Sequence, residues 1–218
     1  MKLLLTSAGL TNQTIANALL ELAEKPFKEL KLAFIPTAAN VEEGDKDWLI
    51  DDLVNCKKWK FASIDIVDIS AIPREMWEKR LTKADILVFG GGNIFHLMYW
   101  LEKSGLKELL PEMLKTKVYV GISAGSMVTS PKLMPLLEDL YYPNGVGKNK
   151  DEGGMRFIDF QILSHFNSPW YPNIRAEYLE EKIKGVSDVI YALDDNSAIQ
   201  INDDTIKVVS EGEWKRFN

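Results

Sequence analysis

The stretch VYVGISAGSMV, residues 118–128, joins an apolar run to a turn of small residues and decides how the chain folds. A near-continuous apolar run is typical of a parallel strand that helices cover on both faces. Ser123 follows this run between small residues, as in a Gly-x-Ser-x-Gly elbow, whose sharp turn projects a nucleophile beyond the sheet. We therefore expect a reactive serine at the carboxyl end of a buried strand. The alternative is a serine that only caps the following helix.

Apolar runs and helical patterns alternate along the rest of the chain. The apolar runs lie at residues 2–7, 31–37, 63–69, 85–92, 117–123, 158–165, 188–194, 197–203 and 205–211. The helical patterns lie at 12–25, 47–59, 73–84, 93–115 and 173–185, and Ser104–Gly105 divides the fourth into two helices. This alternation predicts a three-layer, doubly wound α/β fold with a mostly parallel sheet and a C-terminal antiparallel edge. We expect one domain, residues 1–218, whose longest loop is 141–156.

The composition limits the kind of partner that the protein can bind. The chain has 218 residues, a formal net charge of −6 and a single cysteine, Cys56, so no intramolecular disulfide can form. An acidic chain argues against a nucleic-acid partner, which usually requires a basic face. The opening run MKLLLTSAGL is too short for a signal sequence, and no apolar run is long enough to span a membrane. We expect a cytoplasmic protein without a membrane partner, and a homodimer is compatible with the sequence.

A second glycine-rich turn, FGGGNIF at 89–95, ends the run that precedes the serine strand. Its backbone N–H groups can approach a ligand closely, so Gly91 and Gly92, together with Ala124, are candidates for an oxyanion hole. A phosphate-binding loop or a simple tight turn is the alternative. The turn lacks the Gly-Lys-Ser/Thr of a Walker motif and the spacing of a dinucleotide-binding motif.

A serine nucleophile needs a base and an acid that orients the base. The chain has two histidines, and His165 ends an apolar run as Ser123 does, whereas His96 lies one turn into a helix. We therefore expect His165 to be the base. The candidate acids follow or precede it in the chain: Asp194, Asp195 and, less favourably, Asn196 in YALDDNSAI, and the earlier Glu138, Asp139 and Asp159.

Four segments together resemble the dipeptidase E and cyanophycinase family of serine peptidases: GGGN (90–93), GISAGS (121–126), FQILSHF (160–166) and LDDNSAI (193–199). The resemblance implies a fold like that of class I glutamine amidotransferases and the release of N-terminal aspartate from dipeptides. It makes Ser123 the nucleophile and His165 the base. Asp195 stands where the family commonly has a glutamate, so the third member of the triad stays open among Asp195, Asp194 and Glu138.

The resemblance also implies where the substrate binds. Arg175 matches an arginine that the family uses for the substrate carboxylate, and Asn93 is a further substrate-binding candidate. Arg156 and Lys132 are weaker candidates for the same cation. A surface arginine paired with Glu177 or Glu180 is the alternative for Arg175.

These residues predict acyl transfer from a small peptide to Ser123, without a metal or other cofactor. Two other functions stay open. An α/β-hydrolase esterase would place its acid before the histidine, at Asp139 or Asp159. A non-catalytic protein would use the two glycine-rich turns to bind a small ligand.

Overall fold

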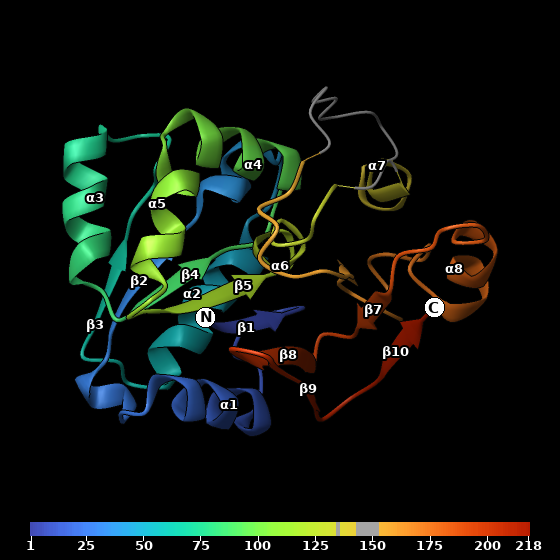
Figure 1. The fold of residues 1–218 in the computed structure, drawn as a ribbon, viewed down its shortest axis with the longest axis horizontal. Coiled ribbons are helices and arrows are strands. Elements are labelled where there is room, and N and C mark those ends of the chain that lie inside the picture. The colour runs from blue at the N-terminus through green and yellow to red at the C-terminus, as the bar shows by residue number, and fades with distance from the viewer. Residues whose placement is uncertain (134–135, 143–152) are drawn as a thin grey trace.

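The computed structural model of the chain describes residues 1–133, 136–142 and 153–218, and in it two sheets lie side by side (Figure 1). The main sheet has the order β3-β2-β4-β5-β1-β8-β9. Its parallel strands are β1 (Lys2–Thr6), β2 (Lys31–Ile35), β3 (Ser63–Ile66), β4 (Ile86–Phe89) and β5 (Val118–Ile122). The hairpin of β8 (Ser197–Asn202) and β9 (Thr205–Ser210) adds the expected antiparallel edge.

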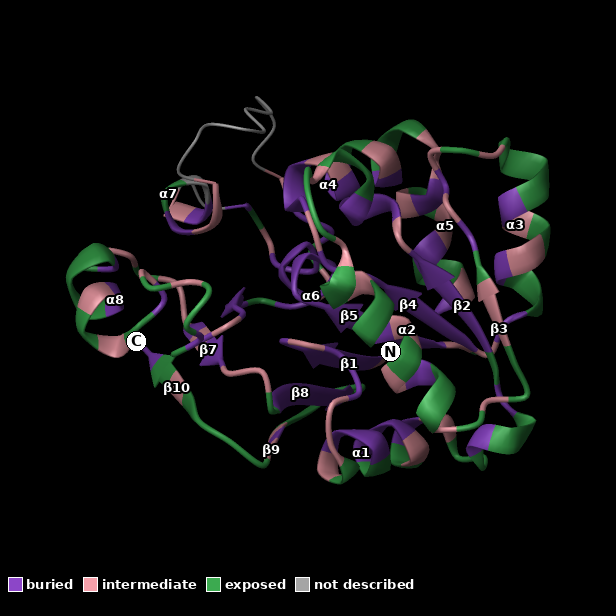
Figure 2. Cartoon of the chain, turned by 180° about the vertical axis from the view of Figure 1, so that it is seen from behind, coloured by how far each residue is buried: buried purple, intermediate pink, exposed green. Residues whose placement is uncertain are grey.

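Helices cover both faces of the main sheet. One face carries α1 (Gln13–Ala23) and α2 (Asp47–Lys58), and the other carries α3 (Arg74–Lys83), α4 (Ile94–Lys103), α5 (Leu106–Met113) and α6 (Ala124–Met127). Successive residues of a strand belong to opposite faces: Leu3 and Leu5 join one buried cluster, and Leu4 joins the other. The central strands are buried along almost their whole length (Figure 2). The expected three-layer, mostly parallel architecture is confirmed.

The helix boundaries follow local chemistry. The side-chain oxygen of Asn12 accepts the N–H of Ile15 and so caps α1. The predicted break between α4 and α5 is confirmed, because Gly105 adopts φ 77° at the junction. Two short 3-10 helices, η1 (Phe27–Glu29) and η2 (Thr37–Val41), precede and follow β2.

The smaller sheet differs from the expectation for the last third of the chain. The runs at 158–165 and 188–194 form only β6 (Gln161–Leu163) and β7 (Ile190–Leu193), which pair with each other and not with the main sheet. A tenth strand, β10 (Trp214–Phe217), pairs with β7 and was not predicted, since only its last residue is buried and its apolar signal is weak. The helices α7 (Leu136–Tyr141) and α8 (Ala176–Lys182) lie beside this sheet (Figure 1).

The parallel strands of the main sheet point their carboxyl ends toward the smaller sheet (Figure 1). Segments that follow β1, β4 and β5 therefore meet segments that follow β6 and β7. Most of the expected 141–156 loop, residues 143–152, lies outside the described residues. Within the described part of the chain, no helix has both the length and the apolar content to cross a membrane.

Asp52 is a buried carboxyl group in α2. The residue is 8% exposed, and its carboxyl group makes no hydrogen bond or ion pair with any described part of the chain. Burial, with a smaller effect of Asp51, raises the pKa of Asp52 to about 8. The folded protein therefore binds one proton that the unfolded chain, whose aspartates titrate near pH ~3.9, releases between about pH 4 and pH 8.

We expect the free energy of unfolding to fall with rising pH across this window, because ionising Asp52 disfavours the folded state. Asp52→Asn should remove this pH dependence and make the protein more stable than wild type at pH 8. Between pH 5 and pH 8, the free energy of unfolding of the variant should gain on the order of 3 kcal/mol relative to that of wild type. Urea denaturation at pH 5, 6.5 and 8 measures this. Asp51→Asn, at the exposed neighbour that makes the smaller contribution, should keep most of the pH dependence. An unchanged pH dependence in Asp52→Asn would contradict the prediction.

Candidate active site

Ser123 occupies a strained turn between β5 and α6. Its backbone has φ 48° and ψ −108°, its N–H donates to the carbonyl of Thr6 (3.1 Å), and its own carbonyl accepts the N–H groups of Ser126 and Met127. A positive φ is uncommon outside glycine and marks a conformation that the surrounding structure imposes. The Ser123 hydroxyl makes no hydrogen bond to the helix that it precedes. The side chain is therefore not a helix cap.

The two glycines beside the serine are required by close backbone contacts. A Cβ atom at Gly121 would lie 2.6 Å from the carbonyl oxygen of Gly125, and one at Gly125 would lie 2.0 Å from the carbonyl oxygen of Phe89. Any larger residue would push α6 away from β4 and β5. The short helix thus packs directly on the sheet and fixes the position of Ser123.

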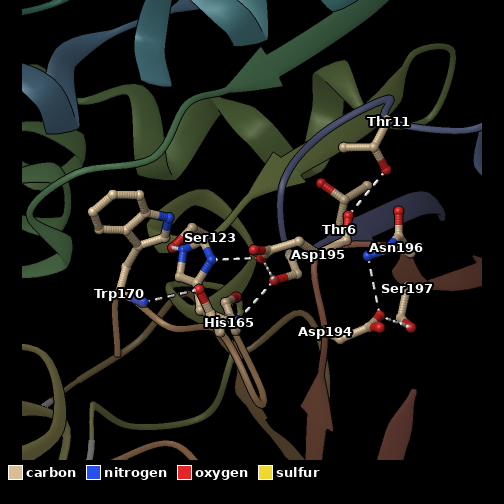
Figure 3. Close-up of polar contacts among 12 residues, drawn as sticks. Thr6, Thr11, Ser123, His165, Trp170, Asp194, Asp195, Asn196 and Ser197 are labelled. Atoms are coloured by element: carbon tan, nitrogen blue, oxygen red, sulfur yellow. Dashed lines mark hydrogen bonds and ion pairs between the residues drawn. The ribbon is translucent and has the colours of Figure 1, made fainter. Parts of the chain in front are cut away.

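His165 and Asp195 complete a chain of hydrogen bonds with Ser123 (Figure 3). The Nε2 atom of His165 lies 3.0 Å from Ser123 Oγ, and its Nδ1 atom lies 2.7 Å from Asp195 Oδ1. His165 follows β6 with φ 63°, and Asp195 lies in the turn between β7 and β8. The structure thus joins three residues that are far apart in the sequence and belong to both sheets.

Ser7, at the carboxyl end of β1, links the histidine to the carboxylate. Its hydroxyl accepts the backbone N–H of His165 (2.8 Å) and donates to Asp195 Oδ1 (3.0 Å). The Thr11 hydroxyl donates to the backbone carbonyl of Asp195 (3.0 Å). Burial acts to raise the pKa of Asp195, but the hydrogen bonds from His165 and Ser7 outweigh burial and hold it below the usual range. Ser7 was not among the residues predicted from the sequence, although it ends the apolar run at 2–7, as Ser123 and His165 end theirs.

The other candidate acids lie elsewhere. Asp194 accepts the N–H groups of Asn196 and Glu213 and the Ser197 hydroxyl, and so organises the turn. Asp139 and Asp159 are exposed and make no hydrogen bond with His165. The Glu138 side chain lies outside the described part of the structure. The acid that contacts the histidine therefore follows it in the chain, contrary to the order that an α/β-hydrolase esterase requires.

The turn at 90–93 runs alongside Ser123. A Cβ atom at Gly91 would lie 3.5 Å from Ser123 Cβ, and one at Gly92, which has φ 122°, would lie 2.4 Å from the carbonyl oxygen of Ala38. Among the described residues, no acceptor binds the N–H of Gly91, Gly92 or Ala124. These donors are free for an oxygen of a bound ligand.

Asn93 closes the same turn as a helix cap. It is 2% exposed, and its side-chain oxygen accepts the N–H of His96 at the start of α4. The Tyr142 hydroxyl donates to the Gly92 carbonyl (3.1 Å) and accepts the N–H of Ile94 (2.9 Å). The glycine-rich turn is thus held from both sides.

Aromatic rings surround His165, and sequence analysis did not identify them. The Tyr171 ring stacks on the imidazole with centroids 4.8 Å apart and planes at 13°. The Tyr141 hydroxyl donates to the Ser164 carbonyl (2.8 Å), which precedes the histidine. Burial is the main cause that raises the pKa of both tyrosines, so both phenols stay neutral. Trp170 lies between His165 and Tyr171 in the chain and is 84% exposed (Figure 3).

The candidate cations differ in availability. Arg175 is exposed at the start of α8 and makes no ion pair with Glu177 or with Glu180, which binds Lys215 instead. Arg156 is also exposed, with φ 59°. Lys132 forms an ion pair with Asp188 (3.0 Å).

The second histidine and the cysteine do not take part in the hydrogen bonds that join Ser123, His165 and Asp195. His96 is half-buried in α4, and burial lowers its pKa. Cys56 is a buried residue of α2, and burial raises the pKa of its thiol to about 12, so the thiol stays protonated. The described residues contain no group of His, Cys, Asp and Glu that could hold a metal ion.

Comparison with solved structures supports the fold. A Listeria monocytogenes EGD-e protein assigned to peptidase E superposes with a TM-score of 0.80 at 23% identity, over 97% of this chain and 98% of that chain. A peptidase from an acI-B1 Actinobacterium gives a TM-score of 0.70 at 19% identity, over 98% and 88% of the two chains. At these identities the likeness shows a shared fold.

Sequence comparison adds the family. An uncharacterized peptidase of Pasteurella multocida is 26% identical over 178 residues, which are 80% of this chain and 82% of that protein. Peptidase E of Nostoc is 25% identical over 191 residues, covering 82% and 72% of the two chains. The profile of peptidase family S51 matches residues 3–209. The chain therefore belongs to peptidase family S51 and is a peptidase.

Proposed function

We propose that the protein is a serine peptidase of the dipeptidase E type, with Ser123 as nucleophile, His165 as base and Asp195 as the acid that orients the base. One observation carries the proposal: Ser123 Oγ lies 3.0 Å from a histidine whose other ring nitrogen lies 2.7 Å from a carboxylate. A hydroxyl paired with an oriented imidazole is the arrangement that activates a serine.

The mechanism follows from these contacts. His165 takes the proton of Ser123 as the hydroxyl attacks the peptide carbonyl, and Asp195 stabilises the imidazolium that forms. The free N–H groups of Gly91, Gly92 and Ala124 bind the oxygen that becomes negative in the transition state. The imidazolium then protonates the departing amine, and water releases the acyl group from Ser123.

The substrate that we propose is a short peptide, in particular a dipeptide with an N-terminal aspartate. Several relatives carry the name Peptidase E, and the exposed Arg175 has neither of its neighbouring glutamates as a partner. A guanidinium suits a substrate carboxylate because its planar fork donates two parallel hydrogen bonds. We assign this contact to Arg175, with Asn93 supporting the turn that binds the reacting carbonyl.

Removing the nucleophile tests the mechanism. Ser123→Ala should stay folded and lose at least about 1000-fold in turnover of Asp-Leu, because no acyl-enzyme can form. Labelling by a serine-directed fluorophosphonate should disappear with it. Ser130→Ala is the control, since the Ser130 hydroxyl is buried and has no hydrogen-bond partner in the described structure. Turnover above about a tenth of wild type in Ser123→Ala would contradict the covalent mechanism.

The two adjacent aspartates test the role of the acid. Asp195→Asn should lower kcat by about 1000-fold or more, because the amide cannot stabilise an imidazolium on His165. Asp194→Asn should keep most of the activity and lower the Tm, since Asp194 binds the turn and not the histidine. Equal losses in the two Asn variants would argue against Asp195.

Substrate choice tests the cation. Arg175→Ala should lower kcat/KM on Asp-Leu by roughly 10- to 100-fold, a moderate effect because the guanidinium is exposed and partly screened by water. Activity on Ala-Leu should change little. Arg156→Ala is measured for comparison, because Arg156 is the other exposed candidate cation. A uniform loss on both peptides would make Arg175 a structural residue.

A further inference from the structure

Glu42 carries a carboxylate oxygen that has no hydrogen-bond partner among the described residues. The residue directly follows η2 and is half-buried. Its Oε1 atom is shielded from solvent and accepts no hydrogen bond from the part of the chain that the structure describes. The ammonium group of Lys46 binds the backbone carbonyl of Glu42 and makes no ion pair with its carboxylate. Buried acceptors, and charged ones above all, normally have donors, so this oxygen calls for a ligand.

The position of Glu42 relates it to the proposed active site. The preceding helix η2 packs against the glycine-rich turn: the Ala38 carbonyl accepts the N–H of Asn93 (2.8 Å) and lies against Gly92. Trp48, a few residues further on, lies against Gly91. The segment around Glu42 therefore wraps the turn that we assign to the oxyanion.

Two tyrosines locate the carboxylate more closely. After burial, the charge of Glu42 contributes to raising the pKa of Tyr142 and of Tyr171, so it lies near both phenols. Tyr142 holds Gly92 through its hydroxyl, and Tyr171 stacks on His165. Glu42 thus lies near residues that contact both the glycine-rich turn and His165.

We propose that Glu42 binds the free α-ammonium group of the peptide substrate and so directs cleavage to the first peptide bond. This inference rests on the proposed function of the site. The α-nitrogen is two covalent bonds, about 2.5 Å, from the carbonyl carbon that Ser123 would attack, so it must lie close to the glycine-rich turn. An ammonium group supplies three donors to a carboxylate, and a charge pair out of water is strong and directional.

Paired substrates test the inference. The kcat/KM for Asp-Leu and for N-acetyl-Asp-Leu is measured with wild type, Glu42→Gln and Glu42→Ala. Wild type should strongly prefer the free amine. Both variants should lose at least about 30-fold on Asp-Leu, as when one partner of a buried charge pair is removed, and should keep the wild-type rate on the acetylated peptide. Glu43→Gln, at the exposed neighbouring glutamate, should behave as wild type.

Either of two kinetic results would overturn the inference. One is an unchanged preference for the free amine in the Glu42 variants, and the other is an equal loss on both peptides, which would make Glu42 a structural residue.

A binding measurement separates this inference from the proposed function. Ser123→Ala and Ser123→Ala/Glu42→Gln are titrated by calorimetry with Asp-Leu, N-acetyl-Asp-Leu and N-acetyl-lysine amide. Binding affinity that depends on both the free α-amine and Glu42 supports the inference. If wild type nevertheless hydrolyses no peptide, only the proposed function fails. Tight binding of N-acetyl-lysine amide would assign Glu42 to a side-chain cation, and no Glu42-dependent difference among the ligands would leave it without a ligand role. Either result overturns the inference.

Discussion

The hydroxyl of Ser7 connects the two sheets at the point where the candidate site forms. It accepts the backbone N–H of His165, which follows the smaller sheet, and donates to Asp195, which lies between the two sheets. Ser7 itself directly follows β1, a strand in the interior of the main sheet, and is fully buried. The buried Ser7 hydroxyl acts as donor and acceptor and so holds both partners at once. Leaving either partner without this hydrogen bond would cost free energy of folding, because the groups are shielded from water. The orientation of His165 toward Ser123 depends on this bond.

Ser123 and His165 share a backbone conformation that is uncommon outside glycine. Ser123 and His165 both have positive φ, and they lie 3.0 Å apart through their side chains. Such conformations persist only where surrounding contacts over-determine them. For Ser123 these contacts are its hydrogen bonds to Thr6 and to the first turn of α6, and for His165 they are the stacked ring of Tyr171 and the bond to Ser7. These contacts hold the two residues with their side chains toward each other.

Local patterns in the sequence predicted the central sheet, the turn at Ser123 and the meeting of His165 with a carboxylate. Each depends on a short signal: a continuous apolar run, glycines at a close approach, or a polar residue at a strand end. The separate smaller sheet was not predictable in this way, because β6 and β7 have the same apolar character as the central strands, and only pairing distinguishes them. Ser7 and Tyr171 were missed because a serine or a tyrosine in a loop has many ordinary roles. Their contacts arise from tertiary structure.

The shorter acid at position 195 illustrates how backbone position compensates for side-chain length. The family resemblance places a glutamate here, and an aspartate has one methylene less with which to reach the imidazole. The backbone makes up the difference: the Thr11 hydroxyl holds the Asp195 carbonyl, and the turn that Asp194 organises brings the carboxylate to 2.7 Å from His165. Ser7 then satisfies the same carboxylate oxygen. A short side chain has fewer rotamers to lose than a long one, so this turn orients the histidine with less loss of conformational entropy than a glutamate would require.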